Sequence, residues 1–280
     1  MNALEIKNLT KTYPGFRLDN LNLTLPSGCI MGLIGENGAG KSTTIKLILD
    51  VLRKDSGSIT VLGRDHQENV RLTREEVGVV MDEVGIPECL TTTQVGNIMK
   101  HTFRTWDEAE YARLLQKFSL PDQKAFKEFS RGMKMKLGIA IAMSHGSKLL
   151  LLDEATGGLD PVVRDEVVEM FHEFTRDETH SILMSSHIVS DLEKLCDYIA
   201  FLHKGKLLLC EEKDVLLSQY GLLHGTEEEL KTLPSVAVRY QKKSPYGVEA
   251  MVLREYVPTG WKLSPISIEE LFVFMSKEAG

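Results

Sequence analysis

The fold is decided by Gly35-Glu36-Asn37-Gly38-Ala39-Gly40-Lys41-Ser42, which fits the pattern G-x-x-x-x-G-K-[ST]. A strand-like apolar run, 29–34, precedes it directly, and a helix-like segment, 41–52, follows it. The glycines let successive backbone N–H groups turn toward phosphate oxygens, and the positive end of the helix acts at the same point. The alternative is a glycine-rich turn followed by Lys-Ser, but chance matches of the four fixed positions occur on the order of one per cent of the time. We therefore predict a phosphate-binding loop, the "phosphate loop", in which Lys41 reaches the β and γ phosphates and Ser42 a magnesium ion.

Around this loop the sequence has the order of an α/β core. Short apolar runs alternate with helix-period segments between residues 29 and 210, as expected of a parallel sheet flanked by helices. Two of the runs are almost continuously apolar, as in strands covered on both faces. The predicted strands of the core are 29–34, 58–62, 77–81, 149–153, 181–186 and 198–202.

Three further segments differ in character from the core. The first 28 residues carry short alternating patterns that predict an antiparallel β flap, and 85–146 has helical periods that predict a helical insert. From about residue 220 the sequence predicts a small α+β appendage, with alternation at Val236, Val238 and Tyr240, an apolar run at 250–253 and a last helix near 268–277. We therefore expect a domain at 1–219, with its helical subdomain at about 85–146, a hairpin near 204–206, and a C-terminal extension at 220–280.

A second motif ends in two carboxylates. The apolar run 149–152 leads into Asp153 and Glu154, where the carboxyl end of a parallel strand would open beside the phosphates. Asp153 suits the surroundings of the magnesium ion, and Glu154 can act as a general base on an attacking water. Strand ends often carry a solvated carboxylate, but the phosphate loop favours the functional interpretation.

Composition excludes several classes of protein. The chain has 280 residues with 40 acidic and 33 basic side chains, a formal net charge of −7, so it has no global basic field for nucleic acid. Apolar residues make up 42% of it, yet no run approaches the roughly 20 needed to cross a bilayer. The opening MNALEIKNLTKTY lacks the pattern of an export signal, and we expect a cytosolic protein.

The cysteines at 29, 89, 196 and 210 form no C-x-x-C pair, and each lies in or beside an apolar segment. We expect free, buried thiols, and neither structural disulfides nor a zinc site.

Three weaker motifs complete an ordered set. Phe129-Ser130-Arg131-Gly132-Met133, the "signature segment", precedes the carboxylate strand and resembles the L-S-G-G-Q motif of ATP-binding cassette (ABC) proteins. Gly157-Gly158-Leu159-Asp160 follows Glu154, and His187 follows the strand 181–186. Together the five motifs resemble a complete ABC ATPase over roughly residues 4–215. The resemblance implies a P-loop NTPase core of the RecA-like type.

The resemblance also implies roles for individual residues. Ser130 and Gly132 would contact the γ phosphate held by a facing subunit, and Asp160 would belong to the loop that crosses the dimer interface. Glu154, His187 and Lys41 would be catalytic, while Ser42 and Asp153 would hold Mg²⁺. The implied ATP-binding positions, apart from the signature segment, are Tyr13, Gly35, Asn37, Gly38, Ala39, Gly40, Lys41, Ser42 and Thr43.

Each of the weaker positions also has a structural interpretation. Asp160 can cap the helix begun by Pro161, which is compatible with a place at the interface. His187 can cap a strand end, and Tyr13, which matches the aromatic residue that stacks on adenine in this family, can pack without contacting a ligand.

The sequence departs from the family pattern at three positions. Asp82 stands where most cassettes have a Gln that touches the metal and senses the transmembrane partner. A carboxylate can also ligate magnesium, so the resemblance keeps Asp82 as a candidate metal ligand. Arg131 and Met133 replace Gly and Gln of the common motif, while Ser130 and Gly132 are kept.

The function that the resemblance implies is the ATPase subunit of a membrane transporter. ATP and Mg²⁺ are the implied cofactors, and a separately encoded transmembrane permease is the implied partner. Two ATPase chains, as a homodimer or a heterodimer, would close on two ATP molecules at the cytoplasmic side of the membrane. The segments NALEIKNLTKTY, ENGAGKSTTIKLIL and DYIAFLHKGKLL resemble bacterial exporters with a six-helix permease, including those that move antibiotics or antimicrobial peptides.

Two other classes remain open at this point. A soluble ABC ATPase that acts on ribosomes or DNA uses the same chemistry, but such proteins usually carry two cassettes or long coiled-coil arms. A catalytically silent regulatory subunit is disfavoured because Lys41, Asp153, Glu154 and His187 are all present. For the extension from residue 220, regulation, dimer contact and a structural cap on the core are all open.

Overall fold

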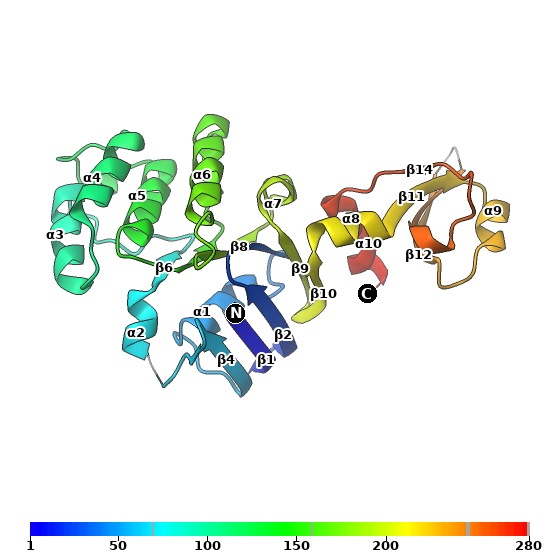
Figure 1. The fold of residues 1–280 in the computed structure, drawn as a ribbon, viewed down its shortest axis with the longest axis horizontal. Coiled ribbons are helices and arrows are strands. Elements are labelled where there is room, and N and C mark those ends of the chain that lie inside the picture. The colour runs from blue at the N-terminus through cyan, green and yellow to red at the C-terminus, as the bar shows by residue number, and fades with distance from the viewer. Residues whose placement is uncertain (69, 158, 245–246, 279–280) are drawn as a thin grey trace.

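A computed structural model describes residues 1–68, 70–157, 159–244 and 247–278 of the chain (Figure 1). Gly158 of the motif after Glu154 lies outside the described residues. In Figure 1 the molecule is elongated, with α3 and α4 at one end and the C-terminal sheet at the other.

A six-stranded sheet forms the centre, in the order β10-β9-β3-β8-β7-β6. β9, β3, β8, β7 and β6 run parallel, and β10 closes the edge as an antiparallel hairpin with β9. The residues of β3, β7 and β8 are all buried, as their continuous apolar sequences predict. The bounds are β3 Ile30–Ile34, β6 Val77–Val80, β7 Leu149–Asp153, β8 Ser181–Ser186, β9 Tyr198–His203 and β10 Lys206–Glu212. The predicted parallel core and hairpin are thus confirmed.

Side chains alternate along each central strand between two hydrophobic cores. Ile30, Leu150 and Ile182 belong to the core that also contains residues of α4, α5, α6, α7 and α10. Met31, Leu151 and Leu183 belong to the second core, between the sheet, α1 and the N-terminal strands. The helices are α1 Lys41–Ile48, α5 Arg131–Met143, α6 Pro161–Phe174 and α7 Val189–Leu195. The predicted first helix ends earlier than expected, since Asp50 has a positive φ of 52°.

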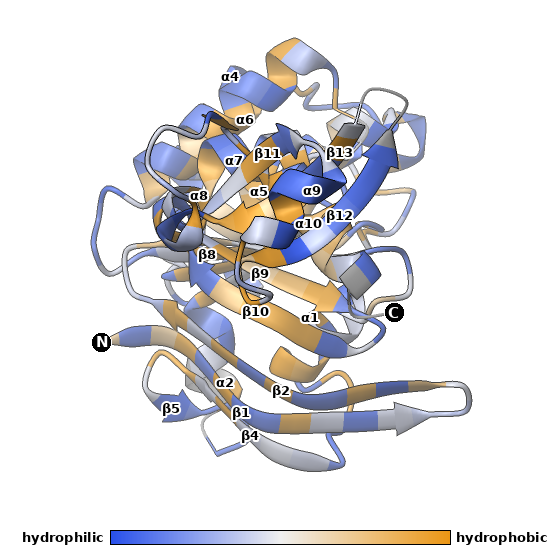
Figure 2. Cartoon of the chain, turned by 90° about the vertical axis from the view of Figure 1, so that its right-hand side faces the viewer, coloured by the Kyte–Doolittle hydropathy of each residue, from blue (hydrophilic) through white to orange (hydrophobic). Residues whose placement is uncertain are grey.

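The N-terminal flap is an antiparallel sheet in the order β2-β1-β4-β5, with β1 Asn2–Tyr13, β2 Phe16–Pro26, β4 Ser56–Val61 and β5 Arg64–Asp65. Figure 2 shows β1, β2 and β4 along one side of the central sheet, whose β9 and β10 are largely hydrophobic. One expectation was wrong: the predicted core strand 58–62 lies largely in β4, which pairs antiparallel with β1 and not with the core. A strand in which every second residue is apolar fits a sheet that is covered on one face only.

Residues 85–146 are helical, as predicted, and contain α3 Thr92–Thr102, α4 Glu108–Lys117, the 3₁₀ helix η1 Phe126–Glu128 and α5. No strand is assigned in this fully described segment, where Thr91 and Ala125 form only an isolated bridge. Before it, α2 Val70–Glu75 leads into β6. The expectation that all four thiols are buried is wrong: only Cys196 is buried, Cys29 and Cys210 are half-buried, and Cys89 is exposed. All four are free.

The C-terminal part contains α8 Lys213–Gln219, β11 Tyr220–Gly225, α9 Glu227–Thr232, β12 Val238–Ser244, β13 Gly247–Leu253, η2 Arg254–Tyr256, β14 Leu263–Ser264 and α10 Ile268–Glu278. Its sheet has the order β12-β13-β11-β14. Val236 lies exposed in a turn before β12, so the predicted alternation starts too early. α10 returns to the centre, where Phe272 packs edge-on against Phe201 of β9 at 5.4 Å between ring centroids. Among the described residues, no helix is long and apolar enough to span a membrane.

Candidate active site

The phosphate loop leaves β3 and enters α1 through two left-handed glycines. Gly38 has a φ of 82° and Gly40 a φ of 113°, a conformation that glycine adopts without a steric cost. A Cβ on Gly35 would lie 2.5 Å from the carbonyl oxygen of Leu202, so no side chain fits there. No side chain caps α1. Its first N–H groups can therefore bind an anion, which fits phosphate.

Lys41 is buried, with 6% of its surface exposed. Its Nζ donates to the carbonyl oxygen of Gly35 at 2.7 Å and lies 3.6 Å from Oε1 of Glu154. Ser42 and Thr43 follow in the first turn of α1 and are half-buried. The ammonium group therefore lies between the phosphate loop and the end of β7.

Asp153 and Glu154 are adjacent in sequence but differ in surroundings. Asp153 ends β7, is buried, and its Oδ1 accepts a hydrogen bond from Oγ of Ser185 at 2.5 Å. Glu154 has a positive φ of 55°, and its N–H donates to the carbonyl oxygen of Ser185 at 3.1 Å. β8 therefore positions both acidic residues through Ser185.

His187 completes this edge of the sheet. Its Nδ1 lies 2.5 Å from Oε2 of Glu154, and its backbone N–H donates to the same oxygen at 3.3 Å. The side chain of Glu154 is 15% exposed and that of His187 is 58% exposed. The structure thus brings Lys41, Asp153, Glu154 and His187 together, with a carboxylate between a cation and an imidazole.

Tyr13 lies at the tip of the flap, near the phosphate loop. Its ring stacks on Phe16 at 6.5 Å between centroids, and Cζ of Phe16 is 3.0 Å from the position a Cβ would take on Gly40. The N–H of Gly205 also donates to the carbonyl oxygen of Ala39 at 3.0 Å, while its own carbonyl accepts from Asp19 of β2. These contacts place a half-buried aromatic residue beside the loop.

The signature segment is not part of this cluster. Ser130 is exposed and caps α5, since its Oγ accepts from the N–H of Met133 at 3.2 Å, and Gly132 lies in the first turn. Nη2 of Arg131 lies 2.6 Å from Oδ1 of Asp82, the candidate metal ligand that follows the edge strand β6. Three strand spacings, or about 14 Å, separate β6 from β3. The signature segment therefore lies across the sheet from the phosphate loop of its own chain.

Asp160 caps α6 as predicted, since its Oδ1 accepts from the N–H of Val163 at 3.1 Å. Asp160, Pro161 and Val162 are all exposed, and Val162 is 69% exposed. An ion pair that the sequence did not reveal connects this region to the helix after His187: Nε of Arg164 in α6 lies 3.6 Å from the largely buried Oδ2 of Asp191 in α7.

Ser185 was also missed by sequence reasoning. The signal was available, because two serines follow the apolar run 182–184 directly before His187. A buried polar side chain at a strand end usually has a hydrogen-bond partner, and here the partner is Asp153.

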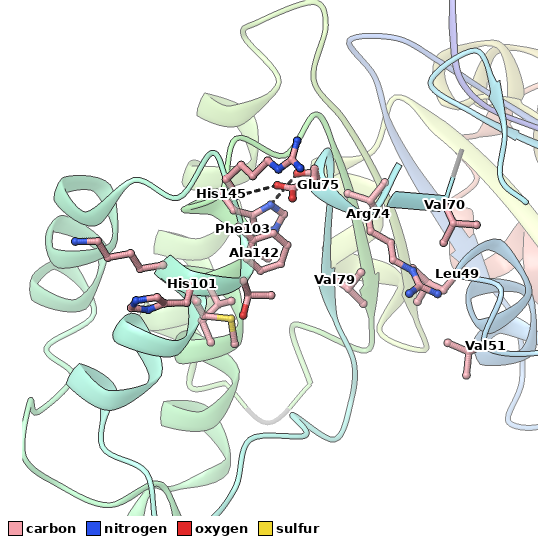
Figure 3. A pocket seen from close by; sticks show the side chains of 16 residues that line it. Leu49, Val51, Val70, Arg74, Glu75, Val79, His101, Phe103, Ala142 and His145 are labelled. Carbon is pink, nitrogen blue, oxygen red and sulfur yellow. Dashed lines mark hydrogen bonds between the residues drawn. The ribbon is translucent and has the colours of Figure 1, made fainter. Parts of the chain in front are cut away.

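A groove of about 950 Å³ opens elsewhere, between α1, α2 and β6 on one side and the helical segment on the other (Figure 3). Leu49, Val51 and Val79 contribute apolar surface, and Arg74 and Arg104 contribute positive charge. The groove's further lining residues are Val70, Glu75, Val77, Met99, Lys100, His101, Thr102, Phe103, Ile141, Ala142 and His145.

His145 forms part of the wall of this groove. Its ring stacks on Phe103 at 4.0 Å between centroids, and its Nδ1 lies 3.1 Å from the carbonyl oxygen of Glu75. Burial lowers the pKa of His145 below its ordinary value, although the contact with Glu75 acts in the opposite direction. Arg74 and Arg104 supply positive charge to the lining of the groove.

Comparisons with known proteins identify the family of the chain. The profile of the ABC transporter family matches residues 18–157. The lantibiotic transport ATP-binding protein SrtF of Streptococcus pyogenes is 39% identical over 215 residues, which cover 75% of this chain and 91% of that protein. The bacitracin transport ATP-binding protein BcrA of Bacillus licheniformis is 34% identical over 73% of this chain and 68% of its own length.

A solved structure of an ATP-binding subunit of an ABC transporter superposes with a TM-score of 0.71 at 29% identity, covering 78% of this chain and 92% of that one. The motifs of the sequence and these likenesses point to the same family. The chain belongs to the ABC transporter family, as one of its ATP-binding and ATP-hydrolysing subunits.

Proposed function

We propose that this subunit hydrolyses ATP at a site shared by two ATPase chains and thereby drives an exporter. The observation that carries the proposal is the position of Glu154 between Lys41, at 3.6 Å, and His187, at 2.5 Å, beside the phosphate loop. A carboxylate held in this way can accept a proton from water. The water oxygen then bonds to the γ phosphorus as the bond to the ADP oxygen breaks.

The residues near Glu154 have separate tasks in this proposal. His187 fixes one carboxylate oxygen, so that the other faces the phosphate loop, and Lys41 balances the negative charge of the phosphates. Ser42 and Asp153 offer a hydroxyl and a carboxylate, which are oxygen ligands that Mg²⁺ prefers alongside phosphate oxygens. No cluster of three or more His, Cys, Asp or Glu residues suited to a metal occurs in the described part of the chain. This fits an ion that is held largely by the nucleotide and neutralises its charge.

The two-chain site follows from the position of the signature segment. Ser130 and Gly132 lie across the sheet from their own phosphate loop, while Ser130 is exposed. A second chain, identical or related, would bring its phosphate loop to them. Asp160 and the exposed Val162 would then lie at the contact between the chains.

The test is Glu154→Gln, which keeps the shape of the side chain but removes the base. We expect phosphate release to fall by about 100-fold or more, and Mg-ATP to hold the variant as a dimer by solution mass. Glu169→Gln, at an exposed glutamate of α6, is the matched control and should behave as wild type. Hydrolysis by Glu154→Gln at the wild-type rate would refute the assignment of the base.

We further propose that the groove of Figure 3 binds a separately encoded permease, which would hold this subunit at the cytoplasmic side of the membrane. Export requires a membrane partner, and the groove combines apolar side chains, an exposed Val51 and the basic side chains of Arg74 and Arg104. A short amphipathic segment with an acidic residue has the matching chemistry. The relatives named for lantibiotic and bacitracin transport suggest an antimicrobial peptide as cargo.

The groove is tested with Val51→Lys, which places a charge on its apolar wall. The Val51→Lys protein is mixed with membranes from cells of the same species that lack the native chain. We expect that this variant no longer sediments with the membranes but still binds ATP. Val236→Lys, at an exposed valine of the C-terminal part, is the control and should still sediment. Equal sedimentation of both variants would rule out this groove as the docking site.

For the domain organisation, we propose an ATPase domain at 1–219 and an extension at 220–280 that caps the core. Support comes from the sheet that begins with β11 at Tyr220. Leu271 and Phe274 of α10 are buried in the same core as the central strands. Removal of the extension would expose that surface, which favours a structural role.

A further inference from the structure

Two departures from the family pattern meet in space. Asp82 follows β6, and Arg131 is the first residue of α5, yet Nη2 of Arg131 lies 2.6 Å from Oδ1 of Asp82. The two positions are 49 residues apart in sequence. The ion pair joins the helical segment to the edge of the central sheet.

The pair is exposed and therefore exchangeable. The side chain of Arg131 is 61% exposed and that of Asp82 is 49% exposed. Exposed ion pairs contribute little to stability, because water solvates both partners well. Nη2 of Arg131 also lies 3.8 Å from the position a Cβ would take on Gly157, in the segment that leads to Asp160. The guanidinium group is thus at the meeting point of three segments and is not locked there by burial.

The charge around Arg131 favours an anionic partner. The first turn of α5 has no acidic residue. A cation at the positive end of a helix is unfavourable unless an anion compensates it. Asp82 supplies that anion in the single chain. Glu83, Glu88 and Lys134 line the same pocket, and Glu83, which follows Asp82 in sequence, is a candidate replacement if Asp82 is removed.

We propose that Arg131 exchanges partners when two chains close: its guanidinium leaves Asp82 and binds phosphate oxygens of the ATP held by the facing chain. This rests on the proposed two-chain site, in which Ser130 and Gly132, on either side of Arg131, face that nucleotide. A guanidinium group can donate two parallel hydrogen bonds to a phosphate or to a carboxylate. The same donors of Arg131 can therefore bind either Asp82 or the nucleotide. Asp82 therefore opposes pairing of the two chains by holding Arg131, whereas Arg131 promotes pairing when it binds the nucleotide.

The experiment measures the ATP concentration at which half of the Glu154→Gln protein is dimeric, by light scattering. Added to this background, Arg131→Gln should raise that concentration about tenfold, and Asp82→Asn with Glu83→Gln should lower it about fivefold. Combining all of these changes should reproduce Arg131→Gln alone, because Asp82 then has no guanidinium to hold. Arg131→Lys should fall between Arg131→Gln and the background, since lysine keeps the charge but lacks the paired donors.

The control is Arg113→Gln, which removes the exposed ion pair with Glu110 in α4 of the same helical segment. It should leave the half-dimerisation concentration unchanged. The proposal is overturned if Arg131→Gln has no effect, or if the Asp82 and Arg131 changes weaken pairing equally, as a merely structural ion pair would. If the Glu154→Gln background itself does not pair with ATP, the proposed two-chain function fails, and the exchange fails with it.

Discussion

The phosphate-loop side and the signature side of the chain are built in opposite ways. At the first, Lys41 is 6% exposed and Asp153 is 3% exposed, and each makes a hydrogen bond within its own chain. At the second, Arg131 has a side chain that is 61% exposed, and Ser130 bonds to its own helix. The first group is assembled by the fold, whereas the second is presented on the surface.

This difference teaches where the organisation of the site comes from. Buried polar groups in a low-dielectric environment interact strongly and hold a fixed geometry. Exposed groups gain comparable strength only when another surface excludes water from them. Changes on the phosphate-loop side should therefore affect a single chain, while changes on the signature side should act mainly when two chains meet.

The largest effect is expected from Lys41→Met. The variant removes the buried ammonium group and should weaken ATP binding to the single chain by about 100-fold, since a charge-assisted hydrogen bond is worth about 2–3 kcal/mol. Fluorescence titration with a labelled ATP analogue measures this. Lys46→Met, at an exposed position of α1, is the control. An unchanged affinity for Lys41→Met would mean that this side is not the primary nucleotide site.

A smaller effect is expected from Ser185→Ala. The variant leaves Oδ1 of Asp153 without its partner in a buried position, which costs about 1.5–3 kcal/mol. We expect a roughly tenfold higher Mg²⁺ concentration for half-maximal phosphate release.

Ser181→Ala is the matched control for Ser185. It removes a hydroxyl from the other end of β8, where Oγ accepts from the N–H of Gly28. This variant should lose a similar amount of stability but keep the Mg²⁺ dependence. If both variants shift that dependence equally, Ser185 acts only through general stability.

The phosphate-loop side could be predicted from the sequence because its residues are close together along the chain or end apolar strands. Three of the five motifs contain Lys41, Asp153, Glu154 and His187, and the structure brings these four side chains to one edge of the sheet. Parallel strands with short connections bring their carboxyl ends to the same edge. Strand order along the chain is then enough to predict which side chains meet.

Contacts between segments that are distant in sequence could not be predicted from the sequence. The ion pair of Asp82 and Arg131 joins two positions that appeared as separate departures from a pattern. The return of α10 to pack Phe272 against Phe201 depends on the path of the C-terminal sheet. The strand at 58–62 was placed in the wrong sheet, because periodicity shows which face of a strand is buried but not which strand it pairs with.

The smallest effect on the single chain, and the sharpest contrast between the two sides, is expected at Ser130. Ser130→Ala removes the cap of α5 and should lower the free energy of unfolding by about 1 kcal/mol, while Ser130→Asp keeps a capping oxygen and should preserve it. Urea unfolding measures both.

If Ser130 serves only as a cap, Ser130→Asp hydrolyses ATP normally. If it faces the γ phosphate of a second chain, the added carboxylate repels that phosphate, so Ser130→Asp stays folded and binds ATP at its own phosphate loop, yet no longer pairs. Normal pairing by Ser130→Asp would place the signature segment outside the shared site and reduce the contrast between the two sides to one of burial alone.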